Sequence, residues 1–221
     1  MEKIYQIKNL GFAYANTQVL SDLNLTIKAG DFIAITGSNG SGKSTLLKLM
    51  IKELKHQKGS ISIFNQDIES FTDWNKIGYV PQIDQAKSIA FPISVKEMVL
   101  LNLYEEFNLL NQPKKHHYKL TDDVLQMFSL KKFSDKNFNE LSGGQKQRVM
   151  IAKAMVHNPQ VLIFDEPTVG IDQKSKEEFF KILNHINRDH GITIILVTHE
   201  MEAANEHLSR TVKLRDKQIY E

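Results

Sequence analysis

The chain has 221 residues, 41% of them hydrophobic, and a formal net charge of +2. This length is enough for one sizeable core, or for one core with an inserted subdomain. The small charge gives no indication of nucleic-acid binding, and the absence of cysteine excludes disulfides and thiolate metal sites. The N-terminus lacks a signal-peptide pattern, and no apolar run approaches the roughly 20 residues of a membrane-spanning helix. We expect a soluble polypeptide that reaches a membrane only through a partner.

The order of strand and helix patterns predicts an α/β core. The first 28 residues alternate partly with period 2, which indicates an antiparallel β region. Further strands are expected at 32–35, 61–64, 77–80, 161–164 and 192–197, with turns at 58–60 and 65–67. Helical patterns at 46–51 and 173–189 alternate with these strands, as in a parallel sheet. Two short strands are expected around Asp216-Lys217.

Helical patterns in the middle of the chain predict a helical subdomain, about residues 83–157, that is inserted into this core. Ser94 and Glu97 form a capping-box pattern, which begins a helical stretch that continues to about Leu110. Pro113 breaks this stretch, and further helices are expected at 122–129 and 142–156. We therefore expect a single domain over residues 1–221 that contains this insertion.

A phosphate-binding P-loop is the most specific motif. It fits G-x-x-x-x-G-K-[ST] and consists of Gly37, Ser38, Asn39, Gly40, Ser41, Gly42, Lys43, Ser44 and Thr45. The glycines let backbone N–H groups surround an anion, toward which the following helix points its positive end. Lys43 can reach the β- and γ-phosphates of a nucleotide, and Ser44 can ligate Mg²⁺. The strand-loop-helix context disfavours the alternative, a glycine-rich turn without a ligand.

Two carboxylates, Asp165 and Glu166, follow the apolar strand at 161–164. Because parallel sheets bind ligands at the carboxyl ends of their strands, we expect both beside the P-loop. Asp165 is predicted to hold Mg²⁺, directly or through water. Glu166 is predicted to orient the attacking water or to accept its proton. A pair of solvated acids is the alternative.

A second anion site is predicted at the start of the helix at 142–156. Ser142 can cap this helix, and Gly143 and Gly144 expose backbone N–H groups at its positive end. A nucleotide on the P-loop does not need this second site within its own subunit. Gln145 completes the pentapeptide Leu141–Gln145, and a plain glycine-rich helix start is the alternative.

With these motifs, the chain resembles the nucleotide-binding subunit of an ATP-binding-cassette (ABC) transporter over essentially its whole length. The motifs occur in the family's order: the P-loop, the Q-loop Gln82, the signature Leu141–Gln145, the Walker B strand Val161–Glu166, the D-loop Gly170–Asp172 and the switch histidine His199. The resemblance implies a P-loop NTPase (RecA-like) core of the ABC ATPase type.

The resemblance also implies roles for single residues. Tyr14 stacks on adenine, and Gln82 approaches Mg²⁺ and the attacking water and couples to the transmembrane subunit. His199 hydrogen-bonds the γ-phosphate, and Asp172 contacts the opposite subunit. The structural alternatives are a core aromatic, a surface glutamine, a structural histidine and a helix N-cap, respectively.

The implied partners follow from the same resemblance. Two copies face each other head to tail, with ATP and Mg²⁺ between the P-loop of one and the signature residues Ser142, Gly143, Gly144 and Gln145 of the other. ATP closes this homodimer and hydrolysis opens it. The groove near Gln82 passes the motion to a membrane permease at the cytoplasmic face of the cell membrane. An extracytoplasmic solute-binding protein acts with the permease.

Short variations on these motifs resemble the zinc/manganese importer branch, namely Phe91–Val95, Glu166–Asp172 and the pair Phe179-Phe180. His116-His117 follow two lysines, and a solvated polar loop is favoured over a metal role there. No regulatory domain is expected after Glu221. The alternatives are another cargo, by import or export, and a non-transport mechanical ABC ATPase.

Overall fold

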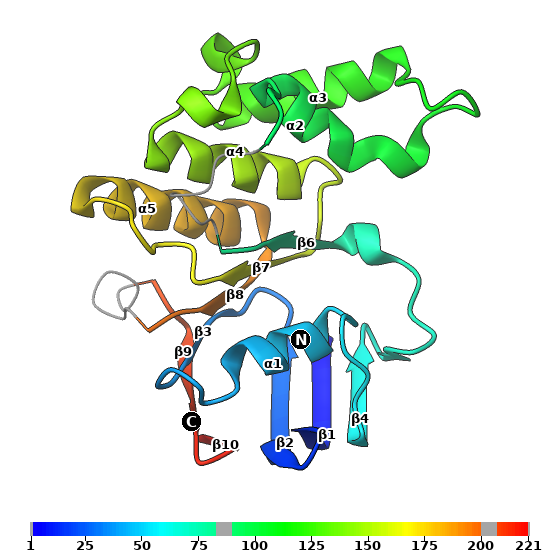
Figure 1. Cartoon of the computed structure of the whole chain (residues 1–221), viewed down its shortest axis with the longest axis vertical. Coiled ribbons are helices and arrows are strands. Elements are labelled where there is room, and N and C mark those ends of the chain that lie inside the picture. The colour runs from blue at the N-terminus through cyan, green and yellow to red at the C-terminus, as the bar shows by residue number, and fades with distance from the viewer. Residues whose placement is uncertain (1, 83–89, 200–206, 221) are drawn as a thin grey trace.

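Two β-sheets and a layer of helices build the molecule, and the computed structural model of the chain describes residues 2–82, 90–199 and 207–220. Figure 1 shows the helical layer at one end, a mainly parallel sheet in the middle and an antiparallel sheet at the other end. The expected start of the helical subdomain, residue 83, lies outside the described residues. The limits of this subdomain therefore stay a prediction.

The middle sheet has the strand order β10-β9-β3-β8-β7-β6. Its strands are β3 (Phe32–Thr36), β6 (Ile77–Val80), β7 (Val161–Asp165), β8 (Thr193–Val197), β9 (Arg210–Arg215) and β10 (Gln218–Tyr220). The pairs from β9 to β6 are parallel, and β10 pairs with β9 in the antiparallel sense. This topology confirms the predicted α/β class.

Successive residues of the central strands belong to two different hydrophobic cores, because the side chains of a strand alternate between its faces. Leu162 of β7 and Ile194 of β8 pack with the helical layer. Their neighbours Ile163 and Ile195 pack with the antiparallel sheet and with the helix between the sheets. Burial on both faces explains why these strands read as continuous apolar runs in the sequence.

The antiparallel sheet has the order β2-β1-β4-β5. Its strands are β1 (Lys3–Tyr14), β2 (Thr17–Lys28), β4 (Lys58–Ile63) and β5 (Gln66–Asp67). The expected turn at 58–60 is wrong, because β4 already begins at Lys58, and the turn that follows the strand lies at Phe64-Asn65. Gly59 has a φ of +80°, and a Cβ there would lie 2.3 Å from the carbonyl oxygen of Lys8. This glycine therefore serves the close approach of two strands.

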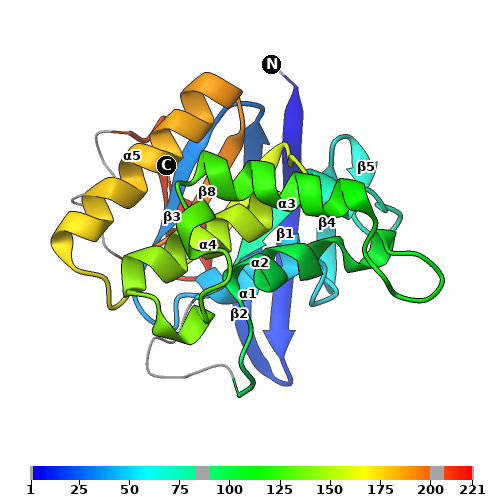
Figure 2. The ribbon, with the colours of Figure 1, turned by 90° about the horizontal axis from the view of Figure 1, so that it is seen from above.

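The helices occupy both faces of the middle sheet. Helix α1 (Lys43–Met50) lies between the two sheets, and α5 (Gln173–His190) covers the opposite face (Figure 1). The outer layer contains α2 (Val95–Leu100), the 3₁₀ helix η2 (Leu101–Glu106), α3 (Lys115–Met127) and α4 (Gly143–Met155). Seen from above, α2, α3 and α4 lie side by side, with α5 flanking them (Figure 2). Within the described part of the chain, no helix is long and apolar enough to cross a membrane.

The expected helix from 94 to about 110 is shorter in the structure. The capping box between Ser94 and Glu97 is present, but α2 ends at Leu100 and η2 ends at Glu106. Beyond that point the side chains of Leu109 and Leu110 are exposed, so they give a continuing helix no apolar face to bury. The side chain of Asn108 instead accepts hydrogen bonds from the backbone N–H groups of Leu110 and Gln112, which stabilises a turn.

Helix α3 begins at Lys115, seven residues before the expected start at Asp122. The histidine pair His116-His117 therefore lies in its first turn, and the expected solvated loop is wrong. His117 is fully buried, and its Nδ1 accepts a hydrogen bond from the backbone N–H of Lys114 at 2.9 Å. The hydrophobic pattern misses this turn because a histidine and Thr121 occupy buried positions.

Candidate active site

Four neighbouring parallel strands deliver the predicted site residues to one edge of the middle sheet. The P-loop follows β3, His199 follows β8, Glu166 follows β7 and Gln82 follows β6. The register brings these strand ends level, since Ile35 and Asp165 both pair with Val197. Residues from four distant parts of the sequence thus meet at the carboxyl ends of the strands.

A cavity of about 580 Å³ lies at this edge. It is lined by Tyr14, Val19, Asn39, Gly40, Gly42, Lys43, Ser44, Thr45, Gln82, Glu166, Val169 and His199. Most predicted nucleotide-binding residues therefore share one cavity. Gly37, Ser38 and Ser41 line a neighbouring hollow on the other side of the P-loop.

The P-loop leads directly into helix α1. Gly42 occupies the N-cap position with a φ of +104°, a conformation that favours glycine, and no side chain caps the helix. The first backbone N–H groups of α1 thus have no side-chain acceptor and can bind an anion. Lys43 is buried, and its ammonium donates to the carbonyl oxygens of Gly37 at 2.9 Å and Ser38 at 3.1 Å. These contacts hold a positive charge inside the loop.

Asp165 ends β7 with a carboxylate oxygen, Oδ1, that is buried and has no hydrogen-bond partner. Burial raises the pKa of this carboxyl group, and the neighbouring charge of Glu166 raises it further. Tyr79 on the adjacent strand lies against this acid, and burial together with Asp165 raises the pKa of the tyrosine to about 12. A cation at Oδ1 would relieve both the desolvation and the repulsion.

Glu166 has a φ of +48°, which is uncommon for a residue with a side chain. Its backbone N–H donates to the carbonyl of Val197 at 2.9 Å, which ties the end of β7 to the end of β8. Its side-chain Oε2 accepts a hydrogen bond from Nδ1 of His199 at 2.5 Å. The two chemical groups predicted from separate motifs are therefore in direct contact beside the P-loop.

Tyr14 lies at the end of β1 and is half-exposed, so it is not a core aromatic. Its ring packs edge-to-face against Phe12 at 4.9 Å between centroids and lines the cavity. A flat face next to the P-loop suits stacking with a nucleotide base. Val19 and Val169 line the same cavity but carry no chemical signal in the sequence, so sequence reasoning could not find them.

The signature residues do not line this cavity. Ser142 caps α4, with its Oγ accepting from the N–H of Gln145 and the Gln145 side chain accepting from the N–H of Ser142 at 3.0 Å. A Cβ on Gly144 would lie 2.8 Å from Oγ of Ser175, so this glycine also permits close contact with α5. The predicted second anion site and the P-loop cavity therefore lie apart within one chain.

Asp172 is the N-cap of α5, which agrees with the structural alternative for this residue. Its Oδ1 accepts from the N–H of Ser175 at 3.0 Å, and hydrogen bonds with Ser175 lower the pKa of its carboxyl group. The side chain is exposed, so a contact with another subunit stays a prediction.

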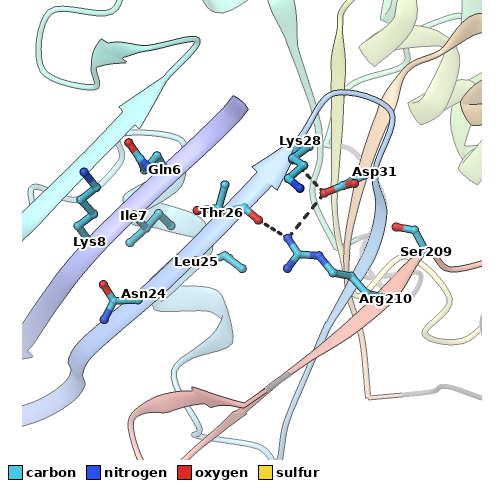
Figure 3. Close-up of a pocket in the computed structure, with 10 residues that line it drawn as sticks. All are labelled: Gln6, Ile7, Lys8, Asn24, Leu25, Thr26, Lys28, Asp31, Ser209 and Arg210. Carbon is cyan, nitrogen blue, oxygen red and sulfur yellow. Dashed lines mark hydrogen bonds and ion pairs between the residues drawn. The ribbon is translucent and has the colours of Figure 1, made fainter. Parts of the chain in front are cut away.

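A hollow of about 660 Å³ lies at the opposite end of β3, between the antiparallel sheet and β9 (Figure 3). In this hollow, the guanidinium of Arg210 donates a hydrogen bond to the carbonyl oxygen of Thr26 and lies 3.6 Å from Oδ2 of Asp31. The same Oδ2 accepts a hydrogen bond from the backbone N–H of Lys28 at 2.9 Å. These contacts join the two sheets. None of the predicted site residues lines this hollow.

A P-loop at the end of a central strand, with an acid pair and a histidine on the neighbouring strand ends, defines a P-loop nucleoside triphosphatase. The comparisons with known proteins are more specific. The profile of the family described as ABC transporter matches residues 20–169. The chain belongs to this family and is an ATPase of the ABC type.

Individual relatives match almost the whole chain. The zinc uptake system ATP-binding protein ZurA of Listeria innocua is 37% identical over 221 residues, which cover 100% of this chain and 86% of the relative. The manganese transport system ATP-binding protein MntB of the same species is 36% identical over 214 residues, which cover 96% and 87%. A dimeric structure of a bacterial ABC transporter cassette superposes with a TM-score of 0.80 at 30% identity, covering 99% of this chain and 97% of that one.

The substitution Lys43→Ala should weaken ATP binding by roughly 10- to 100-fold, because a hydrogen bond to a charged group contributes about 1.5–3 kcal/mol. Isothermal titration calorimetry with ATP measures this change. Lys55→Ala is the matched control, since Lys55 is an exposed lysine that does not line the P-loop cavity. Equal affinities of wild type and Lys43→Ala would contradict the assignment of the P-loop.

Proposed function

We propose that the chain is the ATP-hydrolysing subunit of a membrane importer for zinc or manganese. The convergence of Lys43, Asp165, Glu166 and His199 at one sheet edge carries the ATPase part of this proposal. The cargo part rests on the similarity to ATP-binding proteins of a zinc uptake system and a manganese transport system. These relatives leave both metals as candidates.

ATP would lie along the P-loop, with its adenine against Tyr14 and its phosphates against the N-terminus of α1. Lys43 would exchange its bonds to the loop carbonyls for bonds to the phosphates. The buried, unpartnered Oδ1 of Asp165 fits a divalent cation, and Ser44 and Gln82 line the adjoining cavity. These three residues would hold Mg²⁺, which when bound neutralises charge on the phosphates.

Glu166 would act on the water that attacks the γ-phosphorus. As the water oxygen bonds to phosphorus, the bond to the bridging oxygen breaks and the water proton passes to the carboxylate. His199 holds this carboxylate through Nδ1, and its ring lines the cavity where the γ-phosphate is expected. The uncommon φ of Glu166 fits a backbone fixed for function.

Two copies would form the working unit. The capped start of α4 carries the N–H groups of Gly143 and Gly144 at its positive end, and neither residue lines the P-loop cavity of the same chain. A head-to-tail partner would bring its own Ser142, Gly143, Gly144 and Gln145 to the γ-phosphate, with Asp172 at the contact. The dimeric cassette at 30% identity supports a dimer of this chain. ATP then favours the closed dimer because it binds that state better.

A groove of about 600 Å³ beside β6 suits the permease. It is lined by Tyr79 of β6 and by Pro81, which follows this strand. From the helical layer it is lined by Leu101, Tyr104 and Lys153. Leu101 and Tyr104 are half-exposed although both are large and hydrophobic. Since Pro81 immediately precedes Gln82, a segment bound here can respond to events at the phosphate site.

This arrangement would place the chain at the cytoplasmic face of the membrane, held there by the permease, with a solute-binding protein delivering the metal from outside. Import or export of another cargo, and a mechanical task without transport, are the alternatives. Neither is favoured by the similarity to the two metal transport systems.

Glu166→Gln should lower ATP turnover by about 10²- to 10⁴-fold, the contribution of a positioned general base, while ATP binding persists. ATP should then trap the variant as a dimer, which light scattering after gel filtration detects. Glu177→Gln, an exposed glutamate on α5, is the control and should turn over like wild type. Normal turnover of Glu166→Gln would exclude Glu166 as the base.

Leu101→Asp should uncouple the ATPase from transport, because a charge in the groove opposes an apolar contact with the permease. We expect the purified chain to hydrolyse ATP at the wild-type rate, while cells lose at least 10-fold of their uptake of labelled zinc or manganese. Leu120→Asp, on the exposed face of α3, is the matched control. Uptake at the wild-type level in Leu101→Asp would refute docking at this groove.

A further inference from the structure

A cluster of histidines around one glutamate lies in the helical layer, apart from the P-loop cavity. Glu106 ends η2, His116 and His117 lie in the first turn of α3, and His157 follows the end of α4. Three separate elements therefore contribute to one cluster. None of these four residues lines the P-loop cavity.

The donor atoms of this cluster are close together. One atom each of Glu106, His116 and His117 lies within 4.8 Å of the other two. Nε2 of His117 is 3.8 Å from one carboxylate oxygen of Glu106, and Nδ1 of His157 is 3.2 Å from the other. A tetrahedral ion with bonds of about 2.0–2.2 Å separates its donor atoms by roughly 3.3–3.6 Å. The spacing of Glu106, His116 and His117 is wider than this, so the exposed side chains of Glu106 and His116 would rotate on binding. His157 lies outside this group of three and would complete the site from its contact with Glu106.

Two of the histidines are already oriented by the protein. His117 is fully buried, and its Nε2, which faces Glu106, has no hydrogen-bond partner. Nε2 of His157 lies 2.8 Å from the carbonyl oxygen of Asn102, so the neutral ring carries its proton there. Its Nδ1 lone pair then faces the Glu106 carboxylate. A backbone carbonyl that fixes the far nitrogen is the usual support of a metal-binding histidine.

We propose that Glu106, His116, His117 and His157 form a binding site for a divalent transition-metal ion, with Zn²⁺ as the preferred ion. Imidazole and carboxylate donors suit zinc, whereas Mg²⁺ and Ca²⁺ prefer oxygen donors alone. The bound ion would join η2, the start of α3 and the end of α4, and so brace the helical layer. The site consists of these residues alone and does not depend on the proposed transport function.

Coordination has an identifiable local cost. Nδ1 of His117 accepts from the N–H of Lys114, so the proton of the neutral ring sits on Nε2. When zinc binds at Nε2, the ring proton must move from Nε2 to Nδ1. Protonated Nδ1 can then no longer accept the hydrogen bond from the backbone N–H of Lys114. The loss resembles that of one helix cap, which is small compared with the binding free energy of zinc at four protein donors.

Zinc titration of the nucleotide-free full chain, followed by competition with a chromogenic chelator, tests the site. We expect one zinc ion per chain. Glu106→Gln and His116→Ala should weaken binding by more than the roughly 10- to 100-fold that loss of a supporting residue costs, because each removes a proposed ligand. Both substituted side chains are exposed, so both variants should fold. The double variant His185→Ala/His190→Ala is the matched control, because it removes an exposed histidine pair on α5 whose rings lie 5.2 Å apart.

Glu166→Gln separates this site from the P-loop cavity and should bind zinc like wild type. Long-range nitrogen-15 spectra of the imidazole rings should show zinc-dependent shifts at His116, His117 and His157 and none at His185. Zinc should also raise the midpoint of thermal unfolding of wild type but not of Glu106→Gln. The absence of stoichiometric binding would overturn the proposal and leave a Glu106–His157 ion pair as the role of the cluster. Equal losses in the α5 control would overturn it as well.

Discussion

The level alignment of four parallel strands is the constraint on which the rest of the structure depends. The carboxyl ends of β3, β8, β7 and β6 must coincide for Lys43, His199, Glu166 and Gln82 to share one cavity. A slip of one residue would turn every side chain of a strand to the other face and exchange the two hydrophobic cores. Burial of both faces therefore fixes the geometry of the site as well as the fold.

Each of the two hydrophobic cores supports a different functional part of the chain. The core between the sheets holds α1 and hence the P-loop, whereas the other core carries the helical layer with the capped start of α4. β7 belongs to both, since Ile163 packs into the first and Phe164 into the second. Asp165 and Glu166 follow at the end of this strand. A movement of the helical layer can therefore shift Asp165 and Glu166, as is needed in an ATPase that drives a membrane partner.

The sequence predicts well which residues meet at the P-loop edge of the sheet, because its motifs combine strong backbone signals with chemically distinct residues. Glycines with positive φ, an apolar strand and a following acid pair leave few alternative folds. The helical layer is predicted less well. The hydrophobic pattern misses the first turn of α3 because His117 occupies its buried position. Leu109 and Leu110 continue the apolar pattern beyond Glu106 although both are exposed, so the pattern predicts too long a helix there. The Glu106–His157 contact joins residues 51 positions apart, and only the packing of η2 against α4 brings them together.

The most direct test of the account is the metal content of cells, measured by mass spectrometry under limiting zinc and then under limiting manganese. Cells that carry the wild-type chain are compared with cells that carry Glu166→Gln, and Glu177→Gln is the control. The account predicts a selective fall in one metal with Glu166→Gln and an unchanged content with Glu177→Gln. Equal contents of both metals in all three strains would contradict metal import, even if the purified chain hydrolyses ATP.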